Sequence, residues 1–285
     1  MTKAKTKIRN FIEAVLKLTR FGNLIIIGLA QYFTAAFLID KSIVFDLRLF
    51  LLSCSTILIA AAGYIINDYY DVKIDFINKP ERVVIGRSIA RRYAILFHVA
   101  LSCVGILIGG YLSLRIGALN IGSVFLLWLY SNNLKRLPLI GNVTVAFLTG
   151  LSIYMVEVYY RTDNSLILIY ASFAFFMTLI REIIKDMEDL KGDNTFGCKT
   201  LPIIWGIRKT KMVIYIILAI FSITVLSLNQ FYVGLPIYYF LICLFIPLLV
   251  LTLRLIRADR MKDFAWLSTF SKLIMLLGIL SMAFL

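Results

Sequence analysis

Long apolar runs recur along the whole chain, and short polar connections separate them. Each run has roughly the 17–25 residues that an α-helix needs to cross a bilayer. The runs are continuous and do not alternate between polar and apolar positions, which favours helices over the strands of a barrel. The pattern therefore predicts an all-α, polytopic membrane protein with nine transmembrane helices. We expect these helices at residues 20–39, 47–66, 94–114, 117–133, 140–160, 164–184, 212–230, 233–254 and 264–284.

Basic residues are concentrated on one side of this predicted topology. Of the 30 lysines and arginines, 25 lie before residue 21 or near the connections after the second, fourth, sixth and eighth helices. Because basic residues mark cytoplasmic segments, the N-terminus and these connections are predicted to face the cytoplasm of a multi-pass protein of the cell membrane. Residues 1–19 form a basic N-terminal arm of a single membrane domain that spans residues 1–285.

Composition narrows the class of protein further. The chain is 61% hydrophobic, more than a soluble domain of this length can bury, and its formal net charge is +14. The charge sits in short loops, so we assign it to topology and to contact with anionic membrane lipids, and not to nucleic-acid binding. No obligate protein partner is evident from the sequence.

Acidic residues gather in two short segments, each directly after a predicted span on the cytoplasmic side. Nine of the sixteen acids fall within residues 68–81 and 182–193. On an α-helix, residues four apart differ by about 40° and rise about 6 Å. Asn67, Asp71 and Asp75 therefore form one stripe, and a single helix over the second segment would place Glu182, Asp186, Asp189 and Asp193 within an arc of about 60°.

Like charges at this spacing repel each other, so a bound cation is expected between them. Mg²⁺ suits such a site because it prefers oxygen ligands and binds through one or two carboxylates together with substrate phosphates. The pattern predicts two or more Mg²⁺ ions on a diphosphate. Acids that only solvate the ends of helices are the alternative for each residue alone. A cation-coupled transporter is a second alternative, although its acids would lie near the middle of the spans.

The two acidic segments resemble the aspartate-rich motifs of the UbiA superfamily of intramembrane prenyltransferases. The resemblance covers nearly the whole chain and includes LTRFGN at 18–23, INKPER at 77–82, YSNNLKRLPLIGN at 130–142 and GCKTLPIIWG at 197–206. It implies a UbiA-type bundle of nine helices with an active site at the cytoplasmic side. It also implies a reaction in which a prenyl diphosphate donor ionises and the carbocation alkylates an acceptor, with Mg²⁺ as Lewis acid.

Matched positions imply roles for individual residues. The residues implied as metal ligands are Asn67, Asp71, Asp75, Asp189 and Asp193. The residues expected to take part in catalysis itself are Asp71, Asp193, Asp68 and Lys73.

The resemblance also implies a set of residues that bind the substrate. Basic residues would contact phosphate, polar residues would line the pocket near the headgroup, and Asp186 would act through metal-bound water or by orienting its neighbours. These residues are Arg82, Lys135, Tyr130, Ser131, Arg20, Asn23 and Asp186, with Lys73 as a further phosphate contact.

The acceptor depends on finer similarities. The segment REIIKDMEDLKGDNTFGCKTLPI at 181–203 is most similar to the digeranylgeranylglyceryl phosphate synthases, which implies transfer of a geranylgeranyl group to the lipid geranylgeranylglyceryl phosphate. The loop INKPERVVIGRSI departs from the proline-rich pattern of many relatives, because Glu81 precedes Arg82 and Val83 replaces a proline. An aromatic acceptor of quinone or chlorophyll-type biosynthesis therefore stays open as the alternative.

Overall fold

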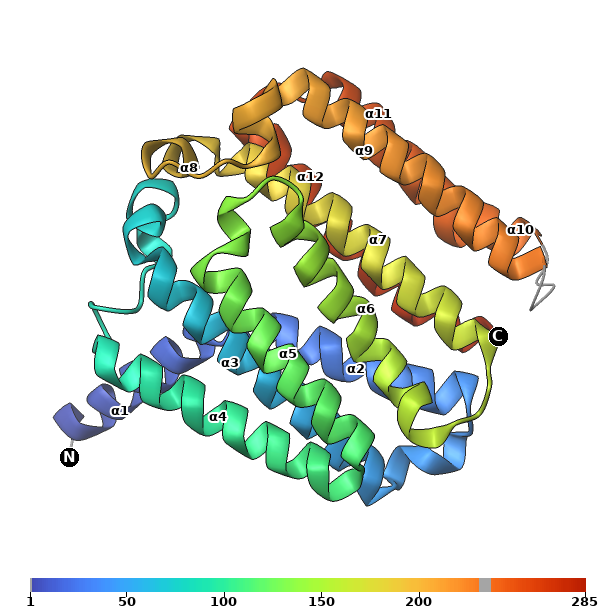
Figure 1. Ribbon diagram of the computed structural model, residues 1–285, viewed down its shortest axis with the longest axis horizontal. Helices are drawn as coiled ribbons and strands as arrows, with labels where there is room; N and C mark the ends of the chain where they lie inside the picture. Colours follow the sequence, from blue (N-terminus) through green and yellow to red (C-terminus); the bar gives the residue numbers. More distant parts are fainter. Residues whose placement is uncertain (1, 231–236) are drawn as a thin grey trace. The chain divides into compact units, whose positions relative to one another are not determined.

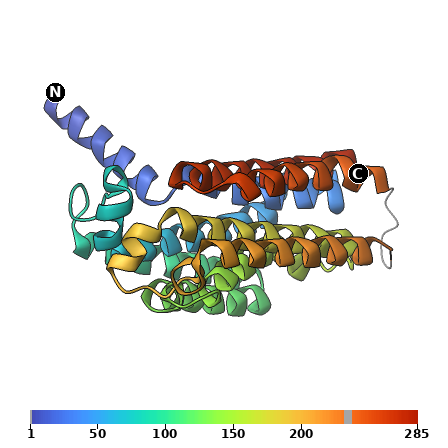
Figure 2. The same cartoon turned by 90° about the horizontal axis from the view of Figure 1, so that it is seen from above.

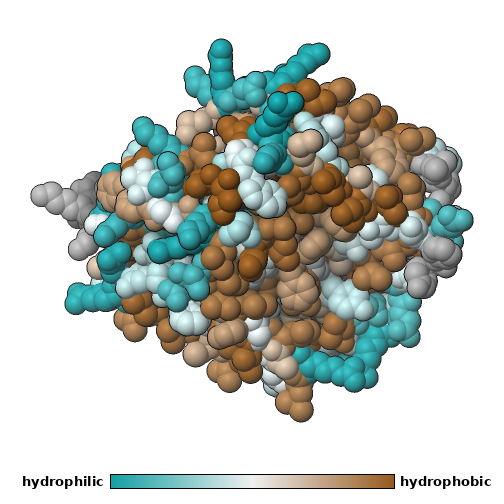
Figure 3. All heavy atoms as spheres, turned by 45° about the horizontal axis from the view of Figure 1, so that its top comes forward, coloured by the Kyte–Doolittle hydropathy of each residue, from teal (hydrophilic) through white to brown (hydrophobic). Residues whose placement is uncertain are grey.

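The apolar runs of the sequence form helices in the computed structural model, which describes residues 2–230 and 237–285 (Figure 1). Within these ranges, eight helices are long and apolar enough to cross a membrane. Hydrophobic side chains make up most of the face shown in Figure 3, as expected for a protein whose solvent is lipid. The eight helices are α2 (Phe21–Leu38), α3 (Leu47–Asn78), α4 (Arg91–Leu112), α5 (Leu114–Asn132), α6 (Ile140–Tyr160), α7 (Ser165–Glu188), α9 (Leu201–Leu228) and α12 (Met261–Ser281).

Eight of the nine predicted spans correspond to these helices. The remaining prediction, 233–254, lies partly outside the described residues, at positions 233–236. From residue 237 onward, its place is taken by α10 (Ile237–Phe240), the π-helix η5 (Leu241–Phe245) and α11 (Ile246–Arg257).

Three helices differ from the prediction because polar residues continue or begin them. α3 has 32 residues and is about 48 Å long, so it extends well past a hydrocarbon core of about 30 Å. α9 begins at Leu201 and is kinked at Gly206, whose φ of 78° favours glycine. The N-terminal arm, for which no helix was predicted, forms α1 (Thr2–Leu18).

Contacts within the chain divide it into two compact units, both inside the single domain predicted from the sequence. Unit 1 comprises residues 1–28 and 47–134, and unit 2 comprises residues 29–46 and 135–285. Each unit is described by itself.

In unit 1, α3 packs against α4 and α5, and small residues allow a close approach. A Cβ at Gly109 of α4 would lie only 2.1 Å from the side-chain nitrogen of Asn120 in α5. The buried Asn120 donates from Nδ2 to Ser55 Oγ at 2.6 Å and to the carbonyl of Gly105 at 3.1 Å. These hydrogen bonds satisfy polar groups inside a membrane bundle, where they have no water to bind.

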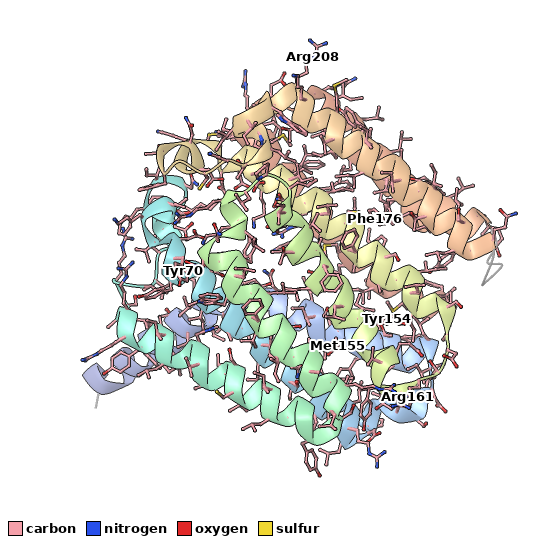
Figure 4. All side chains as sticks on the ribbon, viewed as in Figure 1. Tyr70, Tyr154, Met155, Arg161, Phe176 and Arg208 are labelled. Atoms are coloured by element: carbon pink, nitrogen blue, oxygen red, sulfur yellow. The ribbon has the colours of Figure 1, made fainter. Side chains whose placement is uncertain are left out.

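In unit 2, α7 is the central helix and packs against α6, α9 and α12. Its buried residues, among them Met177, Ile180 and Ile183, belong to one large apolar cluster. Glu157, near the end of α6, is buried, and its carboxylate accepts hydrogen bonds from the Thr162 hydroxyl and from the Asp163 amide at 2.8 Å. This acid therefore closes the loop between α6 and α7, beside Arg161 (Figure 4).

Candidate active site in two acidic segments

The first acidic segment lies in the C-terminal part of α3, in unit 1. Asn67, Asp71 and Asp75 stand at four-residue intervals in one uninterrupted helix, as predicted, and all three are half-buried. Tyr70 lies directly before Asp71 (Figure 4). Lys73, between the acids in sequence, is exposed. The stripe is therefore a structural fact, while its role in catalysis stays a prediction.

Residues of the α1–α2 junction reach the start of this stripe. Arg20 donates from Nη2 to Asp68 Oδ1 at 2.8 Å, and its guanidinium lies 5.0 Å from the ring centroid of Tyr64. Asn23 donates from Nδ2 to the Tyr64 hydroxyl at 3.3 Å. Arg20 adopts a φ of 50°, which directs the chain from one helix into the next. Arg20 and Asn23 thus contact α3 near the first segment, while their predicted part in binding substrate stays a prediction, and Asp68 is engaged in an ion pair.

Asn67 offers an acceptor to a ligand of this segment. Its Oδ1 atom is buried and accepts no hydrogen bond within the described part of the chain. A buried oxygen without a partner is costly, since it has lost its contacts with water. Amide and carboxylate oxygens are the ligands that hard divalent cations use, so Asn67 together with Asp71 fits Mg²⁺.

The loop after α3 is held by basic residues. Arg87 donates from Nη1 to the carbonyl of Pro80 at 2.9 Å, and its guanidinium lies 4.8 Å from the ring centroid of Phe76. Arg91 stacks on Tyr69, with 5.2 Å from its guanidinium to the ring centroid. The backbone of Arg82 ends the short helix η2 (Pro80–Arg82), and its side chain lies outside the described residues.

The second acidic segment lies in unit 2, and its helix is interrupted. α7 ends at Glu188, Asp189 has φ −92° and ψ 8°, and α8 (Leu190–Thr195) follows. The prediction of one helix through Asp193 is therefore wrong. The chain leaves helical hydrogen bonding only at Asp189, because a helix resumes at Leu190 and includes Gly192 and Asn194.

Hydrogen bonds nevertheless keep the acids of this segment ordered. The Asp189 amide donates to the Lys185 carbonyl at 2.8 Å, and the Asp193 amide donates to the Asp189 carbonyl at 3.2 Å. The Asp193 carbonyl in turn accepts from the Cys198 amide at 3.0 Å. Asp189 and Asp193 therefore stay one backbone hydrogen bond apart in spite of the break.

Glu182 is separated from the other acids by its cationic neighbours. It is buried and accepts hydrogen bonds from Arg181 Nη1 at 2.7 Å and from Lys185 Nζ at 2.8 Å. Two cations compensate its charge, so it belongs to the structural frame of the segment.

Asn142 is a site residue that sequence reasoning missed. It is buried in the first turn of α6 and donates from Nδ2 to Asp186 Oδ2 at 2.9 Å. Leu139, just before α6, has a φ of 65°, which is strained for a residue with a branched side chain. Asn142 closes the segment YSNNLKRLPLIGN, but only the fold brings it to an acid 44 residues away.

The three remaining predicted residues end α5 or follow it. Tyr130 and Lys135, the latter in η3 (Leu134–Arg136), are half-buried. Ser131 has 0% exposure, and its hydroxyl donates to the Leu127 carbonyl at 2.8 Å. The hydroxyl proton of Ser131 is therefore used within α5, and its predicted place at the substrate stays a prediction. The carbonyl of Arg136 accepts from the Lys199 amide at 2.8 Å, which ties η3 to the residues after the second segment.

The described residues contain no group of three His, Cys, Asp or Glu side chains close enough to hold a metal ion by themselves. Each segment instead presents a few oxygen ligands spaced along a backbone. This donor set suits a cation that is shared with the phosphates of a substrate.

Known proteins resemble this chain over most of its length. The model of the UbiA prenyltransferase family matches residues 29–280. A digeranylgeranylglyceryl phosphate synthase of Saccharolobus solfataricus is 35% identical over 277 residues, with 95% of each chain covered. The synthase of Sulfurisphaera tokodaii is 33% identical over 250 residues, with 87% of this chain and 89% of that protein covered.

Solved structures share the fold. One, described as giving structural and mechanistic insights into digeranylgeranylglyceryl phosphate synthase in membranes, has a TM-score of 0.72 at 25% identity and covers 95% of this chain and 97% of that one. A UbiA homolog from Archaeoglobus fulgidus bound to GPP and Mg²⁺ has a TM-score of 0.72 at 17% identity, with 95% and 99% covered.

Proposed function

The chain belongs to the UbiA prenyltransferase family, and from this premise we propose that it transfers a geranylgeranyl group from its diphosphate to geranylgeranylglyceryl phosphate, in ether-lipid synthesis. The observation that carries the proposal is the 35% identity, over 95% of both chains, to a protein named digeranylgeranylglyceryl phosphate synthase. The reaction takes place at the cytoplasmic side of the cell membrane, to which the positive-inside rule assigns both acidic segments.

Each acidic segment, taken by itself, would offer oxygen ligands to Mg²⁺ and to the phosphates of a donor. When bound, Mg²⁺ neutralises the diphosphate and makes it a better leaving group. In unit 1 the ligands are Asn67, with its buried unpartnered oxygen, and the acids one and two turns further along α3. In unit 2 they are Asp189 and Asp193, which one backbone hydrogen bond connects.

The remaining polar residues position these ligands or bind phosphate. Arg20 compensates the charge of Asp68, so Asp68 supports the stripe and is not a cation ligand. Asn142 donates a hydrogen bond to Asp186 and orients its carboxyl group. Lys73 and Lys135 carry positive charge that would stabilise a departing diphosphate, and the same role stays a prediction for Arg82, whose side chain lies outside the described residues.

A donor–acceptor screen with the purified full chain tests the proposed function. Geranylgeranyl diphosphate with Mg²⁺ is offered together with geranylgeranylglyceryl phosphate, 4-hydroxybenzoate or dihydroxynaphthoate, and the products are identified by mass spectrometry. We expect the ether-linked lipid phosphate, and no product from an Asp71→Ala variant. A preference for an aromatic acceptor would contradict the assigned acceptor and move the protein to the quinone branch of the family.

A further inference from the structure

The helix α1 is too polar to cross a membrane but is joined directly to a helix that does. Its residues, Thr2–Leu18, include five basic residues and one acid, which gives a net charge of +4. The spanning helix α2 begins only three positions after α1 ends. The C-terminal end of α1 must therefore lie at the surface of the bilayer that α2 enters.

One face of α1 is fixed to unit 1. Ala14 and Leu18, one turn apart, are buried in an apolar cluster with residues of α3 and of the loop that follows it. Lys17 donates a hydrogen bond to the carbonyl of Glu81 in that loop. α1 is thus an attached element, and Figure 2 shows it projecting from the other helices of unit 1.

Within residues 11–18, the face of α1 opposite Ala14 is apolar and exposed. At 100° per residue, Ile12 lies about 160° from Ala14, and Leu16 lies about 40° beyond Ile12. Ile12 is 51% exposed and Leu16 is 41% exposed, while Phe11, between the two faces, is 49% exposed. Arg9 lies about 20° from Leu16 around the helix, so a basic side chain borders the exposed apolar strip.

We propose that α1 lies in the plane of the membrane interface and binds anionic lipid. Ile12 and Leu16 would enter the acyl region, and Arg9 would contact anionic headgroups. A basic, amphipathic helix with low overall hydrophobicity has the properties of such interfacial helices. The positive charge complements the negative surface of the cytoplasmic leaflet.

Because α1 contacts the loop that follows α3, lipid binding by α1 would also affect the end of the first acidic segment. Its buried face and Lys17 hold the loop that follows α3, so lipid binding by α1 would keep that loop at the membrane surface. The proposal does not depend on the acceptor or on the reaction.

Spin labels on neighbouring residues of the full chain test the proposal. In a background without the four native cysteines, labels are placed by Ile12→Cys and, as the matched control on the polar side, by Glu13→Cys. The chain is reconstituted in vesicles of phosphatidylcholine with phosphatidylglycerol. Accessibility to oxygen, which concentrates in the acyl region, is compared with accessibility to a water-soluble nickel chelate.

We expect the label at position 12 to be more accessible to oxygen than to nickel, and the label at 13 to show the reverse. Arg9→Glu should move the label at 12 toward water, as should vesicles of phosphatidylcholine alone, whereas Arg208→Glu, an exposed arginine of α9 (Figure 4), should not. Equal exposure of both labels to nickel would overturn the proposal. So would shielding of position 12 that persists in dilute detergent, because a protein contact would then cover the strip.

Discussion

The first acidic segment lies on one continuous helix, whereas the second crosses a helix break at Asp189. Each segment also contains one acid held by a donor from another helix or junction, and the donors differ in charge. Arg20 pairs with Asp68, and Asn142 binds Asp186. A cationic donor compensates the charge of its acid, whereas a neutral amide donor orients its acid without compensating a charge. The two segments therefore differ both in the continuity of their helix and in the kind of donor that holds one of their acids.

The largest effect on activity is expected for the aspartates that are proposed as cation ligands, one from each segment. Asp71→Ala and Asp193→Ala each remove a proposed ligand from a half-buried position without opening a core cavity. We expect each to lower the rate of prenyl transfer at least about 100-fold, the scale on which loss of a group that stabilises developing charge is felt. Glu188→Ala, in the second segment but outside the proposed site, is the control. Wild-type activity of either aspartate variant would contradict the assignment.

A smaller effect should separate Asn142 from a merely structural asparagine. Asn142→Ala frees the side chain of Asp186, which is proposed to act through metal-bound water or by orienting its neighbours, and loss of such an outer partner of a metal site typically costs about 10–100-fold in affinity or activity. We expect a matching rise in the Mg²⁺ concentration for half-maximal activity and weaker binding of a prenyl thiodiphosphate.

Asn120 provides the matched control because it is also buried and also donates from Nδ2, but to Ser55 and Gly105. Asn120→Ala should lower the thermal midpoint without a change in Mg²⁺ dependence. If the two alanine variants had the same Mg²⁺ dependence, Asn142 would be a packing residue only.

The smallest effect is expected at the compensated acid of the first segment. Arg20→Ala leaves the largely buried Asp68 without its partner, and the cost is about 1–3 kcal/mol of unfolding free energy. Arg20→Ala with Asp68→Asn should recover part of that loss, since the unpaired charge is removed. Denaturation in detergent measures the unfolding free energy of the single variant and of the double variant. If the losses of unfolding free energy caused by Arg20→Ala and Asp68→Asn simply added in the double variant, the two side chains would not interact.

The sequence was sufficient where a feature depends on local periodicity. Uninterrupted apolar runs predicted the spans, and the four-residue spacing of Asn67, Asp71 and Asp75 predicted a helical stripe that α3 confirms. The same spacing rule failed at Asp189, where α7 ends and a separate short helix begins, because spacing alone does not show where a helix is interrupted.

Other features depend on tertiary contacts and could not be read from spacing. The hydrogen bond from Asn142 to Asp186 joins two helices, and nothing in either local sequence indicates it. Burial of Ser131 likewise follows from packing, so its polar side chain near a motif was a poor guide to exposure. The α1 helix was missed because its basic residues were interpreted only as a topology signal.

The most direct measurement of the central claim is the stabilisation of the protein by Mg²⁺ and a non-hydrolysable prenyl thiodiphosphate. A ligand bound only by the folded protein at 100 times its dissociation constant stabilises it by about 2.7 kcal/mol, so the thermal midpoint should rise clearly. Asp71→Asn and Asp193→Asn should each reduce this rise, the double variant should abolish it, and chelator should abolish it in the wild type. A full rise in the double variant would show that the two acidic segments do not bind the diphosphate.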